Sequence, residues 1–380
     1  TETTTVGDDG TWEVTFAPAD VDTGEYTTPV EVTITNDGGS TTVNDTLIVD
    51  TIIGVDAQTA GGADGVINAS EHASGVTLTG TVTGGDAVVV TIAGVDYAAT
   101  VTGSTWTLDL DRGVLAEGEY SVDATVTATD AAGNSSSTTS TIVVDTETSV
   151  TVNTATVGGS DNVVNGAEHP GGVTLTGTAQ PGASVVVTLG TVSQTVIATS
   201  GGTWTASYAA ADVPTGEVDL PVNVVATDAA GNTASATGSV SVDTFVNDLQ
   251  MTSNSAGGSD SVVNFNESSQ SITMAGTVEP GSSVSVNLHG VVMAATVDAS
   301  GNWTVTYPGG TLPGGEYDTT VTVTATDAAG NSSSLSEPVT VDTVAGDLAL
   351  ATQPTETDDV VNAVEHPDGV IISGTPTAGP

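Results

Sequence analysis

Apolar residues and hydroxyl-bearing residues alternate along most of the chain with a period of two. Residues 76–81, 173–178 and 321–326 show this pattern most clearly, and β-branched side chains are frequent in them. This period and composition predict half-buried β-strands. Turn signals, such as those at residues 181–182 and 313–315, separate the strands at intervals of about 8 to 12 residues, the spacing of a β-sandwich. No helical period competes with this pattern.

One sequence pattern recurs four times. Each copy closes on Val-Asp-Thr, with the closing aspartates at Asp50, Asp145, Asp243 and Asp342. Upstream of the last three closures lies Thr-Asp-Ala-Ala-Gly-Asn, at residues 129–134, 227–232 and 326–331, and the first copy has drifted to residues 35–39. A period of roughly 97 residues predicts one domain per copy. We therefore predict three complete units at residues 52–146, 147–244 and 245–343, flanked by the C-terminal part of a unit at 1–51 and the N-terminal part of another at 344–380.

Further residues recur at equivalent positions of the copies. Each of the four copies has one tryptophan, at Trp12, Trp106, Trp204 and Trp303, and a Gly-Glu-Tyr tripeptide follows at Tyr26, Tyr120 and Tyr317, with Val218 in its place in the remaining copy. A tyrosine that opens a strand after a turn is typical of a tyrosine corner, and one tryptophan per copy can anchor an aliphatic core. The sequence therefore predicts an all-β fold, a tandem array of immunoglobulin-like β-sandwich domains of about seven strands each.

Charge and composition exclude several classes of function. The chain has 47 acidic residues and one Lys or Arg, which gives a net charge of −46. A single cation, Arg112, cannot form a basic patch, so we expect no binding to nucleic acid or to an anionic membrane surface. Without Cys there are no disulfides and no thiolate metal sites. No apolar run is long enough to insert directly into a membrane, and with no initial Met and no signal-like start we expect an interior segment of a longer protein.

An acidic cluster follows each closure, with the form D-x-[VI]-[VI]-N-x-x-E. Its members are Asp64, Asn68 and Glu71, then Asp161, Asn165 and Glu168, then Asp260, Asn264 and Glu267, and finally Asp358, Asn362 and Glu365. Calcium takes six to eight oxygen ligands from carboxylates, Asn side chains and carbonyls, so each cluster is nearly a site by itself. In a sandwich, the loop that follows the first strand should lie beside the exit of its own unit, where the closing aspartate also lies.

The Thr-Asp-Ala-Ala-Gly-Asn loop of the next unit should face the same junction. We therefore predict an interdomain calcium site at each junction. The first site would combine Asp50 with Asp130 and Asn134. The second would combine the cluster at 64–71 and Asp145 with Asp228 and Asn232, and the third the cluster at 161–168 and Asp243 with Asp327 and Asn331. The cluster at 260–267 and Asp342 would begin a fourth site. The alternative interpretation is that the loop is a simple type I turn and the cluster only shapes its own loop.

Calcium would also lower the electrostatic cost of folding so acidic a chain. Compaction of a strongly charged chain costs self-repulsion, and a divalent cation at each junction reverses the local sign of charge. We expect the junctions to stiffen on calcium binding. Without calcium we expect the domains to swing on their linkers, because a short Thr-rich connection offers little interface of its own.

The motifs together carry a family resemblance. The series G-x-W, L-x-x-G-E-Y, V-x-A-T-D-A-A-G-N-S and V-D-T resembles the bacterial immunoglobulin-like repeats of giant secreted, calcium-binding RTX-type adhesins and biofilm-associated proteins. The resemblance covers the full chain. It implies an extracellular fibre at the bacterial cell surface, exported by type I secretion, in which neighbouring repeats bind calcium. Such a fibre acts as an extender that projects an adhesive module for cell adhesion and biofilm formation, and the adhesive target is bound by another region.

Other classes of function are weaker. A glycosidase needs a cleft with paired carboxylates, whereas these acids recur in loops once per unit, so we predict no enzyme. A zinc site at His72, His169 and His366 lacks further ligands, and Ser268 replaces the histidine in one copy. A glycan-binding or ice-binding module remains an alternative because of the Thr-rich strands. A halophilic spacer without specific calcium sites would equally explain the missing lysines.

Overall fold

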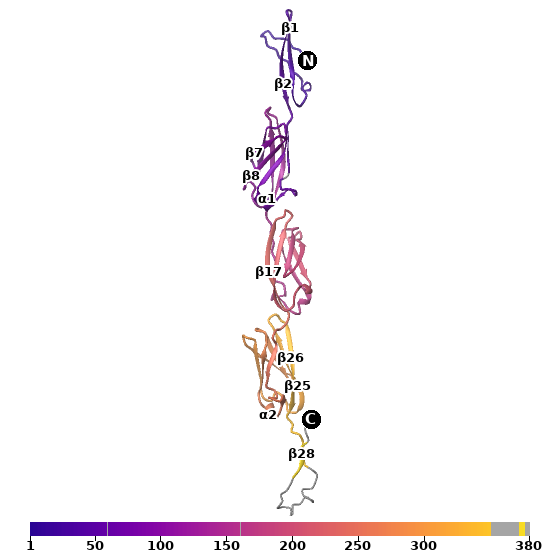
Figure 1. Cartoon of the computed structure of the whole chain (residues 1–380), viewed down its shortest axis with the longest axis vertical. Helices are drawn as coiled ribbons and strands as arrows, with labels where there is room; N and C mark the ends of the chain where they lie inside the picture. The colour runs from indigo at the N-terminus through magenta and orange to yellow at the C-terminus, as the bar shows by residue number, and fades with distance from the viewer. Residues whose placement is uncertain (59, 160, 351–371, 377–380) are drawn as a thin grey trace, which may run out of the picture.

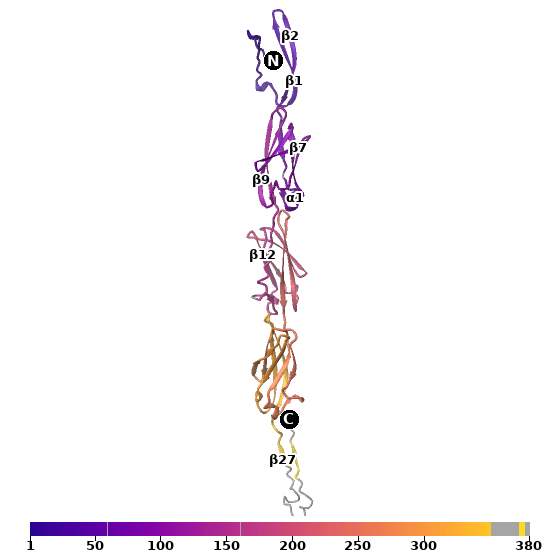
Figure 2. The ribbon, with the colours of Figure 1, turned by 90° about the vertical axis from the view of Figure 1, so that its left-hand side faces the viewer.

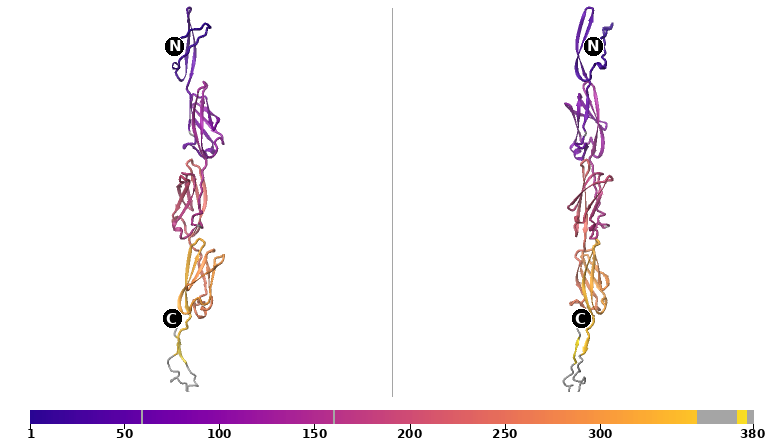
Figure 3. Two further views of the ribbon diagram at one scale, coloured as in Figure 1. Left: turned by 180° about the vertical axis from the view of Figure 1, so that it is seen from behind. Right: turned by 90° about the vertical axis from the view of Figure 1, so that its right-hand side faces the viewer.

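The computed structural model of the chain describes residues 1–58, 60–159, 161–350 and 372–376. The chain is an elongated row of β-rich bodies that follow one another end to end along one axis (Figures 1 and 2). Seen from behind and from the opposite side, the row keeps this extended form (Figure 3). In the described part of the chain, no helix is long and apolar enough to cross a membrane.

Two sheets enclose the core of residues 245–343. The first has the order β18-β20-β24-β23 and the second the order β19-β26-β25-β21-β22. The strands are β18 (Gln250–Asn254), β19 (Val262–Val263), β20 (Ile272–Thr277), β21 (Ser283–Leu288), β22 (Val291–Ala294), β23 (Thr296–Val297), β24 (Asn302–Tyr307), β25 (Glu316–Thr326) and β26 (Ser332–Asp342). The short β19 runs parallel to β26, and the other pairs are antiparallel.

Residues 147–244 repeat this arrangement, with sheets β12-β15 and β11-β17-β16-β13-β14. The strands are β11 (Val163–Val164), β12 (Val173–Thr178), β13 (Ser184–Leu189), β14 (Val192–Ile197), β15 (Thr203–Tyr208), β16 (Glu217–Thr227) and β17 (Thr233–Asp243). Residues 52–146 form the order β3-β5-β8-β7-β6-β9-β10-β4, in which β7 pairs with both β6 and β8 and so joins the two halves. These strands are β3 (Gly54–Ala57), β4 (Val66–Ile67), β5 (Val76–Thr83), β6 (Ala87–Ile92), β7 (Val95–Thr102), β8 (Thr105–Leu110), β9 (Glu119–Thr129) and β10 (Ser135–Asp145).

The two ends of the chain carry simpler elements. The N-terminal end is a long hairpin of β1 (Glu25–Asn36) and β2 (Gly39–Asp50), visible at one tip of the row (Figure 1). Near the C-terminus, β27 (Leu348–Leu350) pairs with β28 (Gly374–Pro376). The prediction of an all-β tandem array of sandwiches is confirmed, because strand elements and facing sheets recur along the chain.

Three separate hydrophobic clusters form the cores, and each takes its residues from one of the predicted complete units. Trp106, Trp204 and Trp303 are at most 1% exposed, which confirms their predicted place in the core. The same prediction is wrong for Trp12, whose side chain is 44% exposed. The physical reason is that, among the described residues, no second sheet packs over the β1–β2 hairpin.

Short helical segments interrupt the strands, which the period of two did not predict. They are α1 (Ala69–Ser74), α2 (Phe265–Ser268) and the 3-10 turns η1 (Pro18–Asp20), η2 (His169–Gly171) and η3 (Ala210–Asp212). The start of α1 is a capping box, in which the Asn68 side chain accepts from the Glu71 amide and the Glu71 carboxylate accepts from the Asn68 amide, each at 3.0 Å. Capping satisfies amide groups that a helix start leaves free, so one turn of helix forms in a short loop.

The tyrosine corners form as predicted. The hydroxyls of Tyr26, Tyr120 and Tyr317 each donate to a backbone carbonyl four residues upstream, at 2.8 to 2.9 Å. In residues 147–244 this position is Val218, so no such bond can form there. The corner therefore fixes the turns that lead into β1, β9 and β25.

We expect Tyr120→Phe to destabilise residues 52–146 by about 1 kcal/mol, the usual net value of one hydrogen bond. The measurement is thermal unfolding of the full chain, followed at a fluorine-labelled Trp106. Tyr97→Phe is the control, because the Tyr97 hydroxyl makes no hydrogen bond with any described residue in the structure. Equal effects of the two substitutions would show that the corner bond contributes nothing.

Candidate metal centre

A glutamate and an aspartate face each other at the exit of every unit. In the hairpin of β16 and β17, Glu217 is the direct partner of Asp243, and these are the first and last residues of the two strands. The same pairing joins Glu25 to Asp50, Glu119 to Asp145 and Glu316 to Asp342. Like charges placed directly opposite each other in a sheet are destabilising. A repeated pair of this kind therefore indicates a function other than holding the sheet together.

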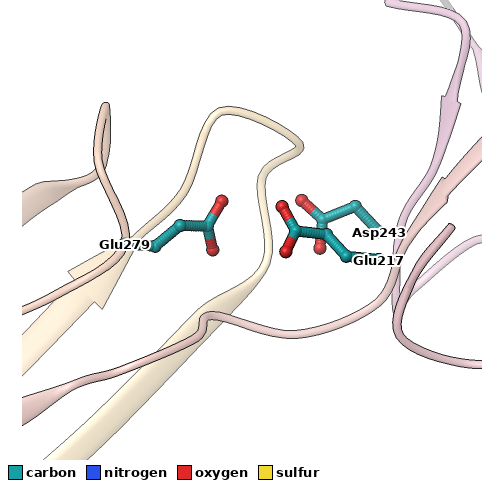
Figure 4. Close-up of side chains that lie close together, drawn as sticks. All are labelled: Glu217, Asp243 and Glu279. Atoms are coloured by element: carbon teal, nitrogen blue, oxygen red, sulfur yellow. The ribbon is translucent and has the colours of Figure 1, made fainter.

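A third carboxylate joins this pair at the junction between residues 147–244 and 245–343. Glu279 lies in the turn between β20 and β21, and carboxylate oxygens of Glu217, Asp243 and Glu279 lie within 4.8 Å of one another. The Glu217 and Asp243 side chains lie side by side, and the Glu279 side chain points toward them from the next unit (Figure 4). We call these three residues the junction triad.

The linker residue Asn247 connects the two sides of the junction triad. Its amide nitrogen donates to Glu279 Oε2 at 3.2 Å, and its side-chain nitrogen donates to Glu217 Oε2 at 2.9 Å. The Glu279 amide in turn donates to the Asn247 carbonyl at 3.0 Å. These bonds fix the position of both glutamates relative to the linker.

The electrostatics of the junction triad are unfavourable for three negative charges. Burial raises the pKa of the Asp243 carboxyl above its usual 3.8, and the carboxylates of Asp327 and Glu217 raise it further. Burial also raises the pKa of Glu279 above its usual 4.5, with a further contribution from the Asp243 carboxylate. Arg112, the only Lys or Arg of the chain, lies in another unit and donates to the Ala73 carbonyl there. The triad consists of oxygen donors alone, the donor set that calcium prefers.

The structure brings several predicted ligands together at this junction. The Asn331 side chain donates to the Asp243 carbonyl at 2.9 Å and to Asp327 Oδ2 at 2.8 Å, and its oxygen accepts from the Gly166 amide at 2.6 Å. The Asn165 side chain donates to the Ala329 carbonyl at 3.0 Å. The loop after the first strand and the loop of the next unit therefore meet at the closing aspartate.

The earlier junctions share this plan. Asn232 donates to the carbonyl of Asp145 and to Asp228, and its oxygen accepts from the Ala69 amide. Asn134 donates to the carbonyl of Asp50 and to Asp130. Of the residues predicted after the last complete unit, Asp342 accepts from the Val344 amide at 3.3 Å, whereas Asp358, Asn362 and Glu365 lie outside the described residues.

Other predicted ligands are engaged within their own loops. The aspartate of each described cluster accepts from the amide two residues later, and its glutamate accepts from the amide of its asparagine. These residues are Asp64 and Glu71, Asp161 and Glu168, and Asp260 and Glu267, with Asn68, Asn165 and Asn264 as the partner asparagines. The bonds are 3.0 to 3.2 Å long. The D-x-[VI]-[VI]-N-x-x-E pattern thus shapes a loop in this structure, and only the side chain of Asn165 also bonds to the next unit among the described residues.

Two of the junction triad residues did not emerge from the sequence. Glu217 belongs to the Gly-Glu-Tyr/Val motif. The glutamate of this motif precedes the closing aspartate by 26 residues in three copies and by 25 in the first, which could have revealed a cross-strand pair of like charges. Glu279 carries no periodic signal, because Gln180 and Thr83 stand at its position in residues 147–244 and 52–146.

Buried oxygens without partners occur at the other junctions. Asp50 Oδ1 and Gln180 Oε1 are buried, and neither has a hydrogen-bond partner in the part of the chain that the structure describes. Burying a polar atom without a hydrogen bond costs free energy. Gln180 occupies the position of Glu279 one unit earlier. These oxygens fit the coordination of a cation at the same place in the fold.

The chain resembles known bacterial proteins. Residues 245–343 match the family model described as bacterial Ig-like domain. A solved chain described for the host cell surface retention of a 1.5-MDa bacterial ice-binding adhesin is 30% identical, with 77% of this chain and 98% of that chain covered and a TM-score of 0.40. A Ca2+-stabilized adhesin that helps an Antarctic bacterium reach out and bind ice is 34% identical, with 89% and 87% covered and a TM-score of 0.38. No curated protein matches the chain.

A third solved structure is a bacterial immunoglobulin-like domain from the M. primoryensis ice-binding adhesin. It is 32% identical and covers 25% of this chain and 95% of its own, with a TM-score of 0.20. The repeated sandwiches and their acidic junctions define the chain as a tandem array of immunoglobulin-like domains. The chain belongs to the bacterial Ig-like domain family of the large adhesins.

Proposed function

We propose that the chain is an extender segment of an adhesin at the bacterial cell surface, and that calcium bound at its interdomain junctions holds neighbouring units in line. In this role it has no catalytic activity and projects an adhesive module for cell adhesion and biofilm formation. The units that repeat are those at residues 52–146, 147–244 and 245–343. The Ca2+-stabilized adhesin that resembles the chain supports the proposal through its sequence identity of 34%.

The junction triad is the observation that carries this proposal. Glu217 and Asp243 come from one unit and Glu279 comes from the next, so a cation held among their oxygens would connect two rigid bodies. Asp243 and Glu279 have raised pKa values because they are partly buried beside other carboxylates. A calcium ion would remove this repulsion and at the same time fix the angle between the units.

The other junctions offer fewer carboxylates. Gln180, a neutral side chain, stands at the sequence position of Glu279 in the unit after the pair of Asp145 and Glu119, and Thr83 stands there in the unit after the pair of Asp50 and Glu25. Calcium affinity increases with the number of charged ligands at a site. We therefore propose that the junction triad binds calcium more tightly than the two earlier junctions.

Calcium titration of the full chain by isothermal calorimetry in high NaCl tests the proposal. We expect Glu279→Gln to weaken binding at the tightest site by about tenfold, because it removes one charged ligand. Glu337→Gln, the same substitution on β26 of the same unit, is the control and should bind as the unsubstituted chain does. Absence of calcium binding, with stability set by NaCl alone, would contradict the proposal and favour a halophilic spacer.

A further inference from the structure

The asparagine of the Thr-Asp-Ala-Ala-Gly-Asn loop connects two units directly. Asn331 is 8% exposed, and its side-chain nitrogen donates across the junction to the Asp243 carbonyl at 2.9 Å and to Asp243 Oδ1 at 3.2 Å. Its side-chain oxygen accepts from the Gly166 amide at 2.6 Å. One amide group thus contacts two separate segments of the preceding unit, the end of β17 and the loop that begins at Asn165.

The loop itself presents Asn331 in one orientation. Asp327 accepts from the Asn331 amide through Oδ1 and from its side-chain nitrogen through Oδ2, both at 2.8 Å. Asp327 is 7% exposed, so this pair is nearly enclosed. Gly330, the residue before Asn331, has a φ of 87°. Glycine adopts this backbone conformation without strain, so the tight turn can form. The asparagine is therefore held in place before it contacts the neighbouring unit.

Asn232 has the same environment one unit earlier. It is 6% exposed and donates to the Asp145 carbonyl at 2.8 Å and to Asp145 Oδ1 at 3.3 Å, while its oxygen accepts from the Ala69 amide at 2.8 Å. Two independent junctions thus use one buried side chain in the same way. A buried amide whose donors and acceptor all have partners specifies a single arrangement, because any other leaves polar groups unpaired.

We infer that this asparagine is an ion-independent latch that orders the interdomain junctions. Its oxygen already accepts a backbone amide and its nitrogen already donates to carbonyl and carboxylate oxygens, so the latch needs no cation. At the second and third junctions it therefore gives an interface that the Thr-rich linker alone does not have, in place of the free swinging expected without calcium. Calcium at the junction triad would add to an arrangement that the latch has selected.

The first junction has only half of this latch. Asn134 donates to the Asp50 carbonyl at 3.0 Å, but no described residue of the N-terminal part donates to its oxygen.

Substitution of Asn331 by aspartate distinguishes a latch from a calcium ligand. Asn331→Asp keeps the size and the accepting oxygen but replaces the donating nitrogen by a carboxylate oxygen that faces Asp243 and Asp327. If Asn331 is a latch, this change removes its donated hydrogen bonds. If Asn331 is a calcium ligand, the change keeps an oxygen that can bind the ion. The full chain has no Cys, so Thr195→Cys and Thr304→Cys, at exposed positions on β14 and β24, accept spin labels that report the distance between the two units.

We expect the distance distribution in EGTA to be narrow for the unsubstituted chain and about twice as wide or more for Asn331→Asp, because units without an interface move independently. Asn302→Asp is the control. Asn302 bonds with Asp298 in the same way as Asn331 bonds with Asp327, but it makes no hydrogen bond to another unit in the described structure. Equal widths for Asn331→Asp and Asn302→Asp in EGTA would overturn the inference.

Hydrogen exchange of the unsubstituted chain gives a second test that does not depend on the folding of a variant. The Gly166 amide has the Asn331 oxygen as its partner, and the Ala69 amide has the Asn232 oxygen. We expect both amides to exchange slowly in EGTA. Exchange at the rate of an exposed loop in EGTA, with slowing only in calcium, would show that the ion and not the asparagine orders the junction.

Discussion

The substitution Gly177→Ala should destabilise residues 147–244 by about 3 kcal/mol, since it forces extra volume into a well-packed core. A Cβ at Gly177 would lie 2.0 Å from the Thr151 carbonyl oxygen and 2.5 Å from the Trp204 ring. Gly80 and Gly276 have the same kind of neighbours in the other two sandwiches, a backbone carbonyl and the buried tryptophan. The glycine thus allows the tryptophan ring and a backbone segment to pack closely on β12.

This loss of stability should lower the melting temperature of that unit by about 12 to 24 °C. The measurement is thermal unfolding of the full chain with fluorine-labelled tryptophans, since Trp204 reports on this unit alone. Gly201→Ala is the matched control, because its nearest heavy atom is the Thr199 hydroxyl oxygen at 3.8 Å, an ordinary contact. If both variants have the same melting temperature as the unsubstituted chain, close packing of the tryptophan on Gly177 does not contribute to stability.

The sequence predicted the repeat and the strands because these depend on local signals. The period of two places Val222 and Val224 on the core face of β16, where both are at most 1% exposed. The predicted burial of the tryptophans depends instead on a complete sandwich around them. Trp12 shows this limit, because its local sequence matches that of Trp303 but its environment does not.

The junction was harder to predict because one residue type serves several purposes. An Asn-x-x-Glu sequence provides oxygen ligands and also forms a capping box, and only the positions of neighbouring amides decide which occurs. In the structure, Glu168 accepts from the Asn165 amide at 3.1 Å, whereas Asn165 also reaches the next unit through the Ala329 carbonyl. Glu279 approaches Asp243 only because two units meet end to end, and no pattern within one unit contains that information.

Calcium should raise the melting temperature of the full chain over that in EDTA, with both samples in high NaCl. Binding to the folded form alone at about 100 times the dissociation constant adds ~2.7 kcal/mol per site. For a unit of this size, that corresponds to a rise of about 10 to 20 °C. Magnesium at the same concentration is the control for divalent charge. An equal rise in magnesium would contradict a specific calcium site.

The Glu279→Gln substitution should change the stability of the chain in opposite directions in EDTA and in calcium. In EDTA at neutral pH it should be more stable than the unsubstituted chain, because it removes one charge from the junction triad. In calcium it should be less stable, because it removes a ligand. The control Glu337→Gln should show neither change. A variant that is less stable in both conditions would indicate that Glu279 has only a structural role.

Acidification in EDTA tests the repulsion among the carboxylates of the junction triad separately from the loss of Glu279 as a calcium ligand. A carboxyl whose pKa is raised in the folded protein binds more protons there than in the unfolded chain, so its repulsive cost falls as the pH falls through the raised value. For Asp243 and Glu279, stability should therefore rise on acidification and reach its full gain below the ordinary pKa values of 3.8 and 4.5.

Carboxyls with a lowered pKa, such as Asp298, act in the opposite direction, so the quantity to compare is the difference in stability between the unsubstituted chain and Glu279→Gln. This difference favours the variant at neutral pH and should shrink as the pH falls, since the substituted glutamine side chain has no proton to gain. A difference that is constant with pH would mean that the three carboxylates do not interact.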